Sequence, residues 1–139
     1  MRSHWVVILV LGLTFAIPSA LATQSAQSTK PGATVPKYNA ATESVFKGTV
    51  QEVRNRECPV SGGLGSHVIL KLDDGSTIEV HLASTKFVKT YDLTVKVGDR
   101  IEVTGSKVQF EGVDTIFARE VKRGDDVFVY RDKDGKPVW

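Results

Sequence analysis

Two neighbouring segments near the middle of the chain alternate between apolar and polar residues, and this pattern constrains the fold most strongly. Apolar side chains occur at every second position of 67–72 and again of 77–82. A period of two places such side chains on one face of an extended strand. Between the segments lies Asp73-Asp74-Gly75-Ser76, which has the composition of a hairpin turn. The pattern therefore predicts an antiparallel hairpin with one buried face. The predicted core positions of this hairpin and of a later strand are Val68, Leu70, Leu72, Ile78, Val80, Leu82, Ile101 and Val103.

The rest of the chain after residue 43 is also rich in strand-forming residues. Further strands are expected at 44–54, 101–108, 115–121 and 127–131, and the chain returns to a strand at 95–99. Gly48 lies inside the first strand, where glycine often marks a bulge or a bend. Segment 83–93 has apolar residues at helical spacing, and Ser84 or Thr85 could cap a short helix there.

This order predicts an all-β fold. We expect a small five-stranded OB-like barrel, with one short helix between strands 3 and 4 and a C-terminal strand extension. An SH3-like barrel is the alternative, and the position of the helix favours the OB-like fold.

The N-terminus has the features of an export signal. An apolar run over 5–17 is shorter than the roughly 20 residues that a transmembrane helix needs, and it precedes the cleavage motif Ala20-Leu21-Ala22. We expect a signal peptide at 1–22, a flexible linker at 23–43 and the OB-like domain at 44–139. The mature chain would be periplasmic or secreted, with no membrane span. An uncleaved membrane anchor is the alternative.

Several segments resemble known exported domains. Segments 46–50 (FKGTV) and 97–105 (VGDRIEVTG) resemble the first and fourth strands of the periplasmic stress-tolerance OB family. Closer similarity, to uncharacterised exported bacterial domains, lies in Val80-His81-Leu82, in 118–121 (AREV) and in the closing segment 131–139. The resemblance implies an exported bacterial OB fold, and its motifs are mainly structural glycines and strand residues.

The sequence favours a binding protein over an enzyme. It contains no G-x-S-x-G, H-E-x-x-H, Walker or G-x-G-x-x-G motif. The glycine-rich segment 62–66 is followed by neither a helix nor a lysine suited to phosphate, so we expect a flexible loop between the first two strands.

Nucleic acid is not the expected partner. The net charge is only +2, and the basic residues are mixed with acidic ones. OB folds that bind single strands stack bases on aromatic side chains of strands 2 and 3. The outer face of the predicted hairpin has no aromatic platform, since it carries His67, Ile69, Lys71, Thr77, Glu79 and His81.

The predicted hairpin has a preferred register. A type I turn with a glycine bulge pairs Leu72 with Ser76, and His67 then lies opposite His81 on the outer face. Directly opposite residues have Cβ atoms about 4.5–5.5 Å apart. A second register, which also keeps the apolar faces together, would place His67 opposite Ala83.

In the first register, His67 and His81 could share a metal ion. Cys58, the only cysteine, is expected in the loop before the second strand, where it could add a thiolate. Two imidazoles and a thiolate suit Zn or Cu. The alternative is that the histidines are ordinary surface residues and Cys58 a buried or free thiol.

Together these features predict an exported, non-catalytic OB-fold binding module of the bacterial cell envelope. Its partner would be a small molecule or an envelope protein. A periplasmic metal-binding protein that holds Zn or Cu through Cys58, His67 and His81 is one alternative. A single-stranded nucleic-acid-binding OB domain is the other.

Overall fold

The computed structural model describes residues 34–139, which form an all-β domain with one short α-helix. The elements are η1 (Ala40–Thr42), β1 (Glu43–Cys58), β2 (Gly63–Leu72), β3 (Thr77–Ser84), α1 (Thr85–Thr90), β4 (Arg100–Phe110), β5 (Val113–Arg123) and β6 (Asp126–Val129). The predicted signal peptide and most of the predicted linker lie outside the described residues. Within residues 34–139, no helix is long and apolar enough to cross a membrane.

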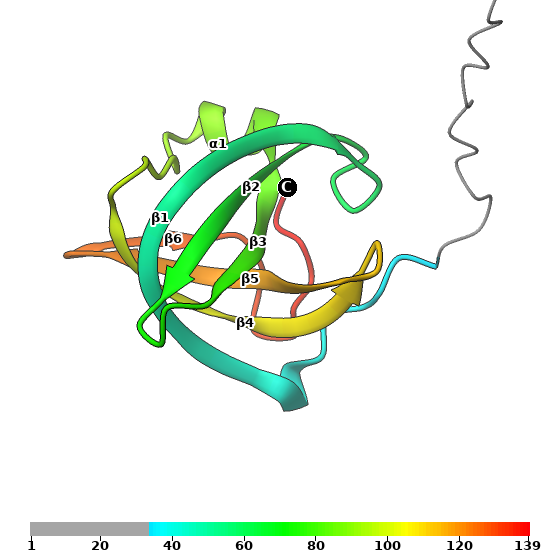
Figure 1. Ribbon diagram of the computed structural model, residues 1–139. Coiled ribbons are helices and arrows are strands. Elements are labelled where there is room, and N and C mark those ends of the chain that lie inside the picture. Colours follow the sequence, from blue (N-terminus) through cyan, green and yellow to red (C-terminus); the bar gives the residue numbers. More distant parts are fainter. Residues whose placement is uncertain (1–33) are drawn as a thin grey trace, which may run out of the picture. The chain divides into compact units, whose positions relative to one another are not determined.

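One sheet contains all six strands in the order β3-β2-β1-β4-β5-β6. The neighbours pair antiparallel, and β3 also pairs with β5 in parallel, so the sheet closes on itself (Figure 1). The predicted count of five strands was therefore too low, because the expected C-terminal extension joins the sheet as β6 beside β5. The strand predicted at 95–99 was wrong. Asp99 Oδ2 accepts a hydrogen bond from the Lys96 N–H at 2.8 Å and closes a turn there.

The first strand is longer than expected and pairs with two partners in succession. Its first half pairs with β4 and its second half with β2, and Figure 1 shows it as a long curved ribbon. A Cβ at Gly48 would collide with the Lys71 carbonyl oxygen, so glycine permits close approach of β2. The bulge itself lies later, between Val50 and Glu52.

The predicted hairpin is confirmed in its first register. The N–H of Leu72 donates to the Ser76 carbonyl at 2.8 Å, and His67 pairs with His81. The register shifts between Ser66 and His67, so that Ser66 pairs with Ala83.

Two sequence-based predictions about the start of β2 were wrong. The glycine-rich segment is largely strand, since Gly63–Leu72 forms β2 and Gly63 pairs with Cys58. Cys58 is consequently the last residue of β1 and does not lie in a loop. Backbone pairing explains both differences, because it continues past the point where the hydrophobic alternation ends.

The helix begins where capping predicts. Ser84 Oγ accepts a hydrogen bond from the Phe87 N–H at 3.2 Å. The helix covers only Thr85–Thr90 of the predicted 83–93, and Asp92 has a positive φ shortly after its end.

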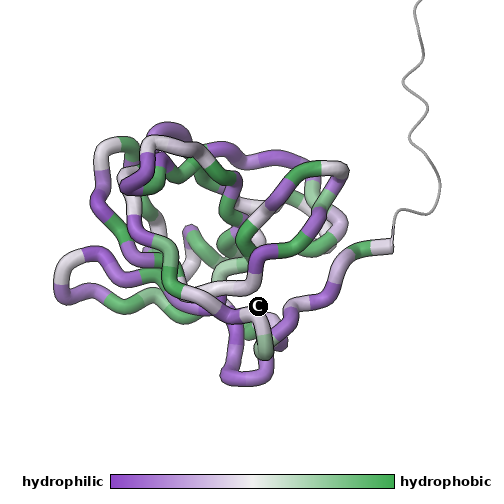
Figure 2. The backbone as a smooth tube through the Cα atoms, turned by 60° about the horizontal axis from the view of Figure 1, so that its bottom comes forward, coloured by the Kyte–Doolittle hydropathy of each residue, from purple (hydrophilic) through white to green (hydrophobic). Residues whose placement is uncertain are grey.

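Hydropathy alternates along the strands, as Figure 2 shows, and the apolar positions meet in one main core. Six of the eight predicted core residues are fully buried. Leu72 and Ile78 are partly buried and pack against the others.

Candidate metal centre

Three neighbouring strands bring Cys58, His67 and His81 together. Cys58 ends β1, His67 lies in β2 and His81 is its partner in β3. The two imidazole rings meet edge to face with centroids 4.8 Å apart. One ligand atom from each of the three residues lies within 4.8 Å of the other two. We call these three residues the metal centre.

The metal centre is buried, which corrects the expectation that the histidines face solvent. His67 and His81 are 0 % exposed and Cys58 is 2 % exposed. The rings of Phe117 and Trp139 lie 5.6 and 5.9 Å from that of His81. The chain after β6 therefore folds back over the β2–β3 hairpin, and Arg131 of this segment forms hydrogen bonds with His81 and Leu82 of β3.

His67 is neutral and has an available nitrogen. Burial, together with the nearby charge of Arg56, lowers its pKa to about 4. Nδ1 lies 2.8 Å from Glu79 Oε1, although the carboxylate is not in line for a good hydrogen bond. Nε2 has no hydrogen-bond partner among the described residues. A carboxylate beside Nδ1 favours the tautomer with its proton there, which leaves the lone pair of Nε2 free for a metal.

Glu79 is held in place by a charged neighbour. Arg56 donates to Glu79 Oε1 from Nη2 at 3.1 Å and from Nε at 3.3 Å. The same oxygen faces His67. Arg56 thus fixes the carboxylate that orients the imidazole.

Gly65 lies where the side chains of the metal centre converge. A Cβ at this position would lie 2.7 Å from Ser61 Oγ, 2.9 Å from the Cβ of Cys58 and 3.0 Å from His67 Nε2. Any larger residue would therefore push these side chains apart. Glycine here permits their close approach next to the unpartnered nitrogen.

The proton of His81 is placed by its two neighbours. Nδ1 lies 3.1 Å from Nη2 of Arg131, and Nε2 lies 2.9 Å from Ser61 Oγ. A guanidinium can only donate, so Nδ1 accepts. Nε2 of the neutral ring then carries the proton and donates a hydrogen bond to Ser61 Oγ. Burial, together with the charge of Arg131, lowers the pKa of His81 to about 2.

Arg131 is a buried cation, only 1 % exposed. Its guanidinium donates to the carbonyl oxygens of Leu82 and Ala118, and it lies 4.9 Å from the ring centroid of Trp139. No carboxylate within residues 34–139 forms an ion pair with it. Burial lowers the pKa of Arg131 to about 10, so it remains charged at neutral pH.

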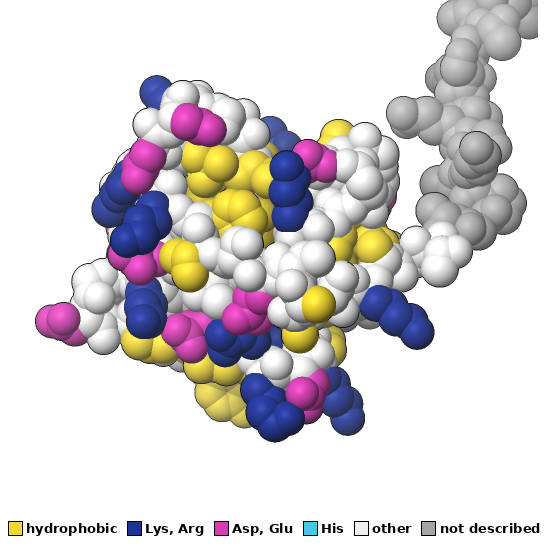
Figure 3. All heavy atoms as spheres, turned by 90° about the horizontal axis from the view of Figure 1, so that it is seen from below, with side chains coloured by type: hydrophobic (Ala, Val, Ile, Leu, Met, Phe, Trp, Pro, Cys, Tyr) yellow, Lys and Arg dark blue, Asp and Glu magenta, His cyan; other side chains and the backbone are white. Residues whose placement is uncertain are grey.

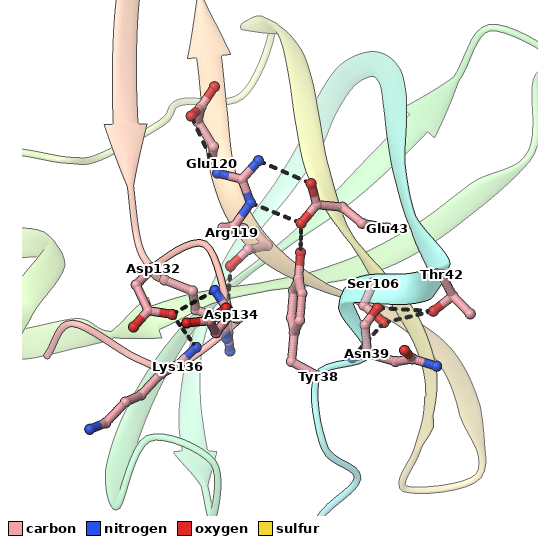
Figure 4. Close-up of polar contacts among 12 residues, drawn as sticks. Tyr38, Asn39, Thr42, Glu43, Ser106, Arg119, Glu120, Asp132, Asp134 and Lys136 are labelled. Atoms are coloured by element: carbon pink, nitrogen blue, oxygen red, sulfur yellow. Dashed lines mark hydrogen bonds and ion pairs between the residues drawn. The ribbon is translucent and has the colours of Figure 1, made fainter.

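The segment before β1 covers Arg131 from another side. Tyr38 donates a hydrogen bond to Glu43, and Arg119 donates to the same carboxylate from Nε at 2.8 Å and from Nη2 at 3.0 Å (Figure 4). The Tyr38 ring lies 5.9 Å from the guanidinium carbon of Arg131. The N-terminal segment is thereby fixed over the metal centre.

A cavity of about 420 Å³ lies between the segment before β1 and the C-terminal segment. Its walls include Tyr38, Arg131 and Phe117, together with Pro59 and Val60, which directly follow Cys58. Tyr38 and Val60 also pack against the small cluster that contains Cys58. Cys58 itself does not line this cavity.

Sequence reasoning identified the three residues of the metal centre but not the roles of the residues around them. It placed Glu79 on the same face of the hairpin as His67 and His81 but gave it no role. From the sequence, Arg131 was noted only within the closing segment 131–139, which resembles exported bacterial domains. No local pattern connects it with His81, fifty residues earlier in the chain.

The fold and this cluster define an all-β bacterial domain with a buried Cys/His site. A family model, that of the MamS/MamX magnetosome protein family, matches residues 42–128. The match covers more than half of the chain, so the chain belongs to this family. It includes all three residues of the metal centre and ends before Arg131. The family differs from the stress-tolerance OB family that segments 46–50 and 97–105 resemble. A search of curated proteins finds no match.

Proposed function

We propose that this chain is an exported, non-catalytic binding protein that holds one soft metal ion, Zn or Cu, in the metal centre. The observation that carries the proposal is the convergence of a thiol and two imidazoles within 4.8 Å in the protein interior. Thiolate and imidazole are ligands that Zn and Cu prefer, whereas Mg²⁺ and Ca²⁺ prefer oxygen.

The unpartnered nitrogen of His67 supports the same proposal. A buried polar atom without a partner is costly, and most are satisfied in native proteins. Gly65 allows Cys58 and His67 to converge beside this nitrogen, and Glu79 lies at the other nitrogen of the ring. Coordination of a metal by Nε2 would satisfy the atom.

The contact between Ser61 and His81 does not favour hydrolysis. A serine nucleophile needs a base with a free lone pair facing its hydroxyl. The guanidinium at Nδ1 instead places the proton of His81 on the nitrogen that faces Ser61. This arrangement supports a binding role over catalysis.

We further propose that the closed sheet is an OB-type barrel formed by β1 to β5. Its antiparallel pairs and the parallel closure of β3 on β5 support this assignment. Nucleic acid is a weaker candidate for the ligand, because Figure 3 shows basic and acidic side chains interspersed on the face it displays. The predicted signal peptide supports export, and the name of the family supports a role in the magnetosome.

Native mass spectrometry of the mature protein, loaded anaerobically with Zn²⁺ or with Cu(I), tests this proposal. We expect one ion per chain in the wild type and loss of that ion in Cys58→Ser and His67→Gln. Ser66→Ala is the matched control, since Ser66 is a buried polar residue of β2 that offers no ligand atom. Absence of bound metal in the wild type would overturn the proposal.

A further inference from the structure

We infer that the metal centre is a Cu(I) site in which Cys58 and His67 are the two main ligands, while Arg131 and His81 disfavour divalent ions. This inference rests on the proposed function and adds the identity and charge of the ion. It follows from three features: the charge around the cluster, the tautomer of His81 and the space beside Gly65.

The first feature is charge. Arg56 and Glu79 pair with each other, so their charges largely cancel. Arg131 has no such partner among the described residues, and it contacts His81 directly. When Cu(I) binds, it replaces the proton of the Cys58 thiol, and this proton is released to solvent. Because Cu(I) and the proton carry the same charge, the net charge of the centre does not change. Zn²⁺ would add one positive charge near a buried guanidinium, where repulsion is poorly screened.

The second feature is the tautomer of His81. Zn²⁺ is almost always four-coordinate and would need this imidazole as a ligand beside Cys58 and His67. Nε2, the nitrogen that faces Ser61, carries the proton, because Arg131 donates to Nδ1. Coordination by His81 would therefore require loss of a second proton or rupture of the contact with Arg131.

The third feature is the narrow space beside Gly65. The Cβ position of Gly65 lies 2.9 Å from the Cβ of Cys58 and 3.0 Å from His67 Nε2. Only glycine fits where the two residues that are free to coordinate converge. Cu(I) is soft, prefers thiolate and forms stable complexes with as few as two ligands. Glu79 would hold His67 in the coordinating tautomer.

Anaerobic competition titrations test the inference, with Cu(I) and a chromophoric chelator in one series and Zn²⁺ and a zinc indicator in the other. Loss of a ligand should reduce the affinity for Cu(I) more than loss of the residue that orients it. Cys58→Ser and His67→Gln should therefore weaken Cu(I) binding by about 100-fold or more. His81→Gln keeps an acceptor for Arg131 and should weaken it by less than about tenfold. Ser66→Ala is the control, and far-UV circular dichroism checks the fold of every variant.

X-ray absorption of the Cu(I)-loaded wild type gives an answer that needs no variant. We expect one sulfur and one nitrogen ligand. Binding of Zn²⁺ as tight as that of Cu(I), or equal losses in His81→Gln and His67→Gln, would overturn the inference and leave the proposed function standing. A spectrum with two nitrogen ligands would do the same. Binding of neither ion would overturn both.

Discussion

The guanidinium of Arg131 lies 3.1 Å from Nδ1 of His81 and forces that nitrogen to accept a hydrogen bond. The proton of the neutral ring is therefore on Nε2, which donates to Ser61. One contact between residues of β3 and the C-terminal segment thus makes His81 a poor ligand and a poor base. It leaves His67 as the imidazole with a free lone pair.

Replacement of Arg131 should change the preference of the metal centre. In Arg131→Gln the positive charge is lost, and the amide oxygen can accept a hydrogen bond from Nδ1–H of His81. We expect the affinity for Zn²⁺ to rise relative to that for Cu(I), measured as the ratio of the two dissociation constants. The variant also leaves carbonyl groups of Leu82 and Ala118 with fewer donors, so a lower melting temperature is expected as well. An unchanged ratio in a folded variant would contradict the role given to Arg131.

A side chain at Gly65 should weaken metal binding, because it would push the ligands apart. Gly65 does not have a positive φ, so alanine changes the packing and not the backbone preference. Its Cβ would lie within 3.0 Å of Cys58 Cβ and His67 Nε2. We expect Gly65→Ala to reduce the affinity for Cu(I) at least about tenfold in the chelator titration. Affinity equal to that of Ser66→Ala would show that the ion does not bind beside Gly65.

Glu79 should act as a positioning residue through His67. Loss of a carboxylate behind a metal-bound histidine typically lowers affinity about 10–100-fold. Glu79→Gln is expected to fall in this range in the same titration, with one Cu(I) still bound per chain. Glu102→Gln is the matched control, because Glu102 is a strand carboxylate paired with Lys47 away from the centre. Equal Cu(I) affinities of the two variants would contradict a positioning role for Glu79.

The segment over the metal centre should be sensitive to acid. Hydrogen bonding from Arg119 lowers the pKa of Glu43, and Tyr38 adds to this effect. A carboxylate with a lowered pKa in the folded state stabilises the fold above its unfolded pKa, and this contribution is lost as pH falls through the folded pKa. Glu43→Gln should therefore lower the melting temperature at pH 7 and have a progressively smaller effect below about pH 4.3, the ordinary glutamate pKa.

Thermal unfolding monitored by circular dichroism at pH 7 and at pH 3.5 measures this difference. Glu57→Gln is the control, since Glu57 is exposed in the same strand and forms no ion pair among the described residues. A destabilisation by Glu43→Gln that is the same at both pH values would mean that the contact acts through packing and not through charge.

The hairpin and its register could be derived from local sequence. The apolar alternation limits the register to those that bury both apolar faces, and the turn expected at Asp73-Asp74-Gly75 favours the one in which His67 lies opposite His81, which the structure confirms. The capping of α1 by Ser84 is likewise a local property. These features depend on residues only a few positions apart, so they can be predicted from local sequence.

The surroundings of the histidines could not be derived in this way. The length of β1 and the inclusion of Cys58 depend on pairing with β2 beyond the alternating segment. The burial of His81 depends on Trp139 and Arg131, which fold back from the C-terminus. Such contacts between distant segments leave no periodic pattern in the sequence. The histidines were therefore predicted on the solvent-exposed face of the hairpin, whereas the structure buries them.

Anomalous diffraction at the copper edge, from crystals of the mature protein grown anaerobically with Cu(I), tests the central claim most directly. The account predicts one anomalous peak per chain within bonding distance, roughly 2.0–2.4 Å, of Cys58 Sγ and His67 Nε2, beside Gly65. Arg131 should still contact Nδ1 of His81 in that structure. A loaded crystal with no peak between Cys58 and His67, or with copper only at surface residues, would contradict it.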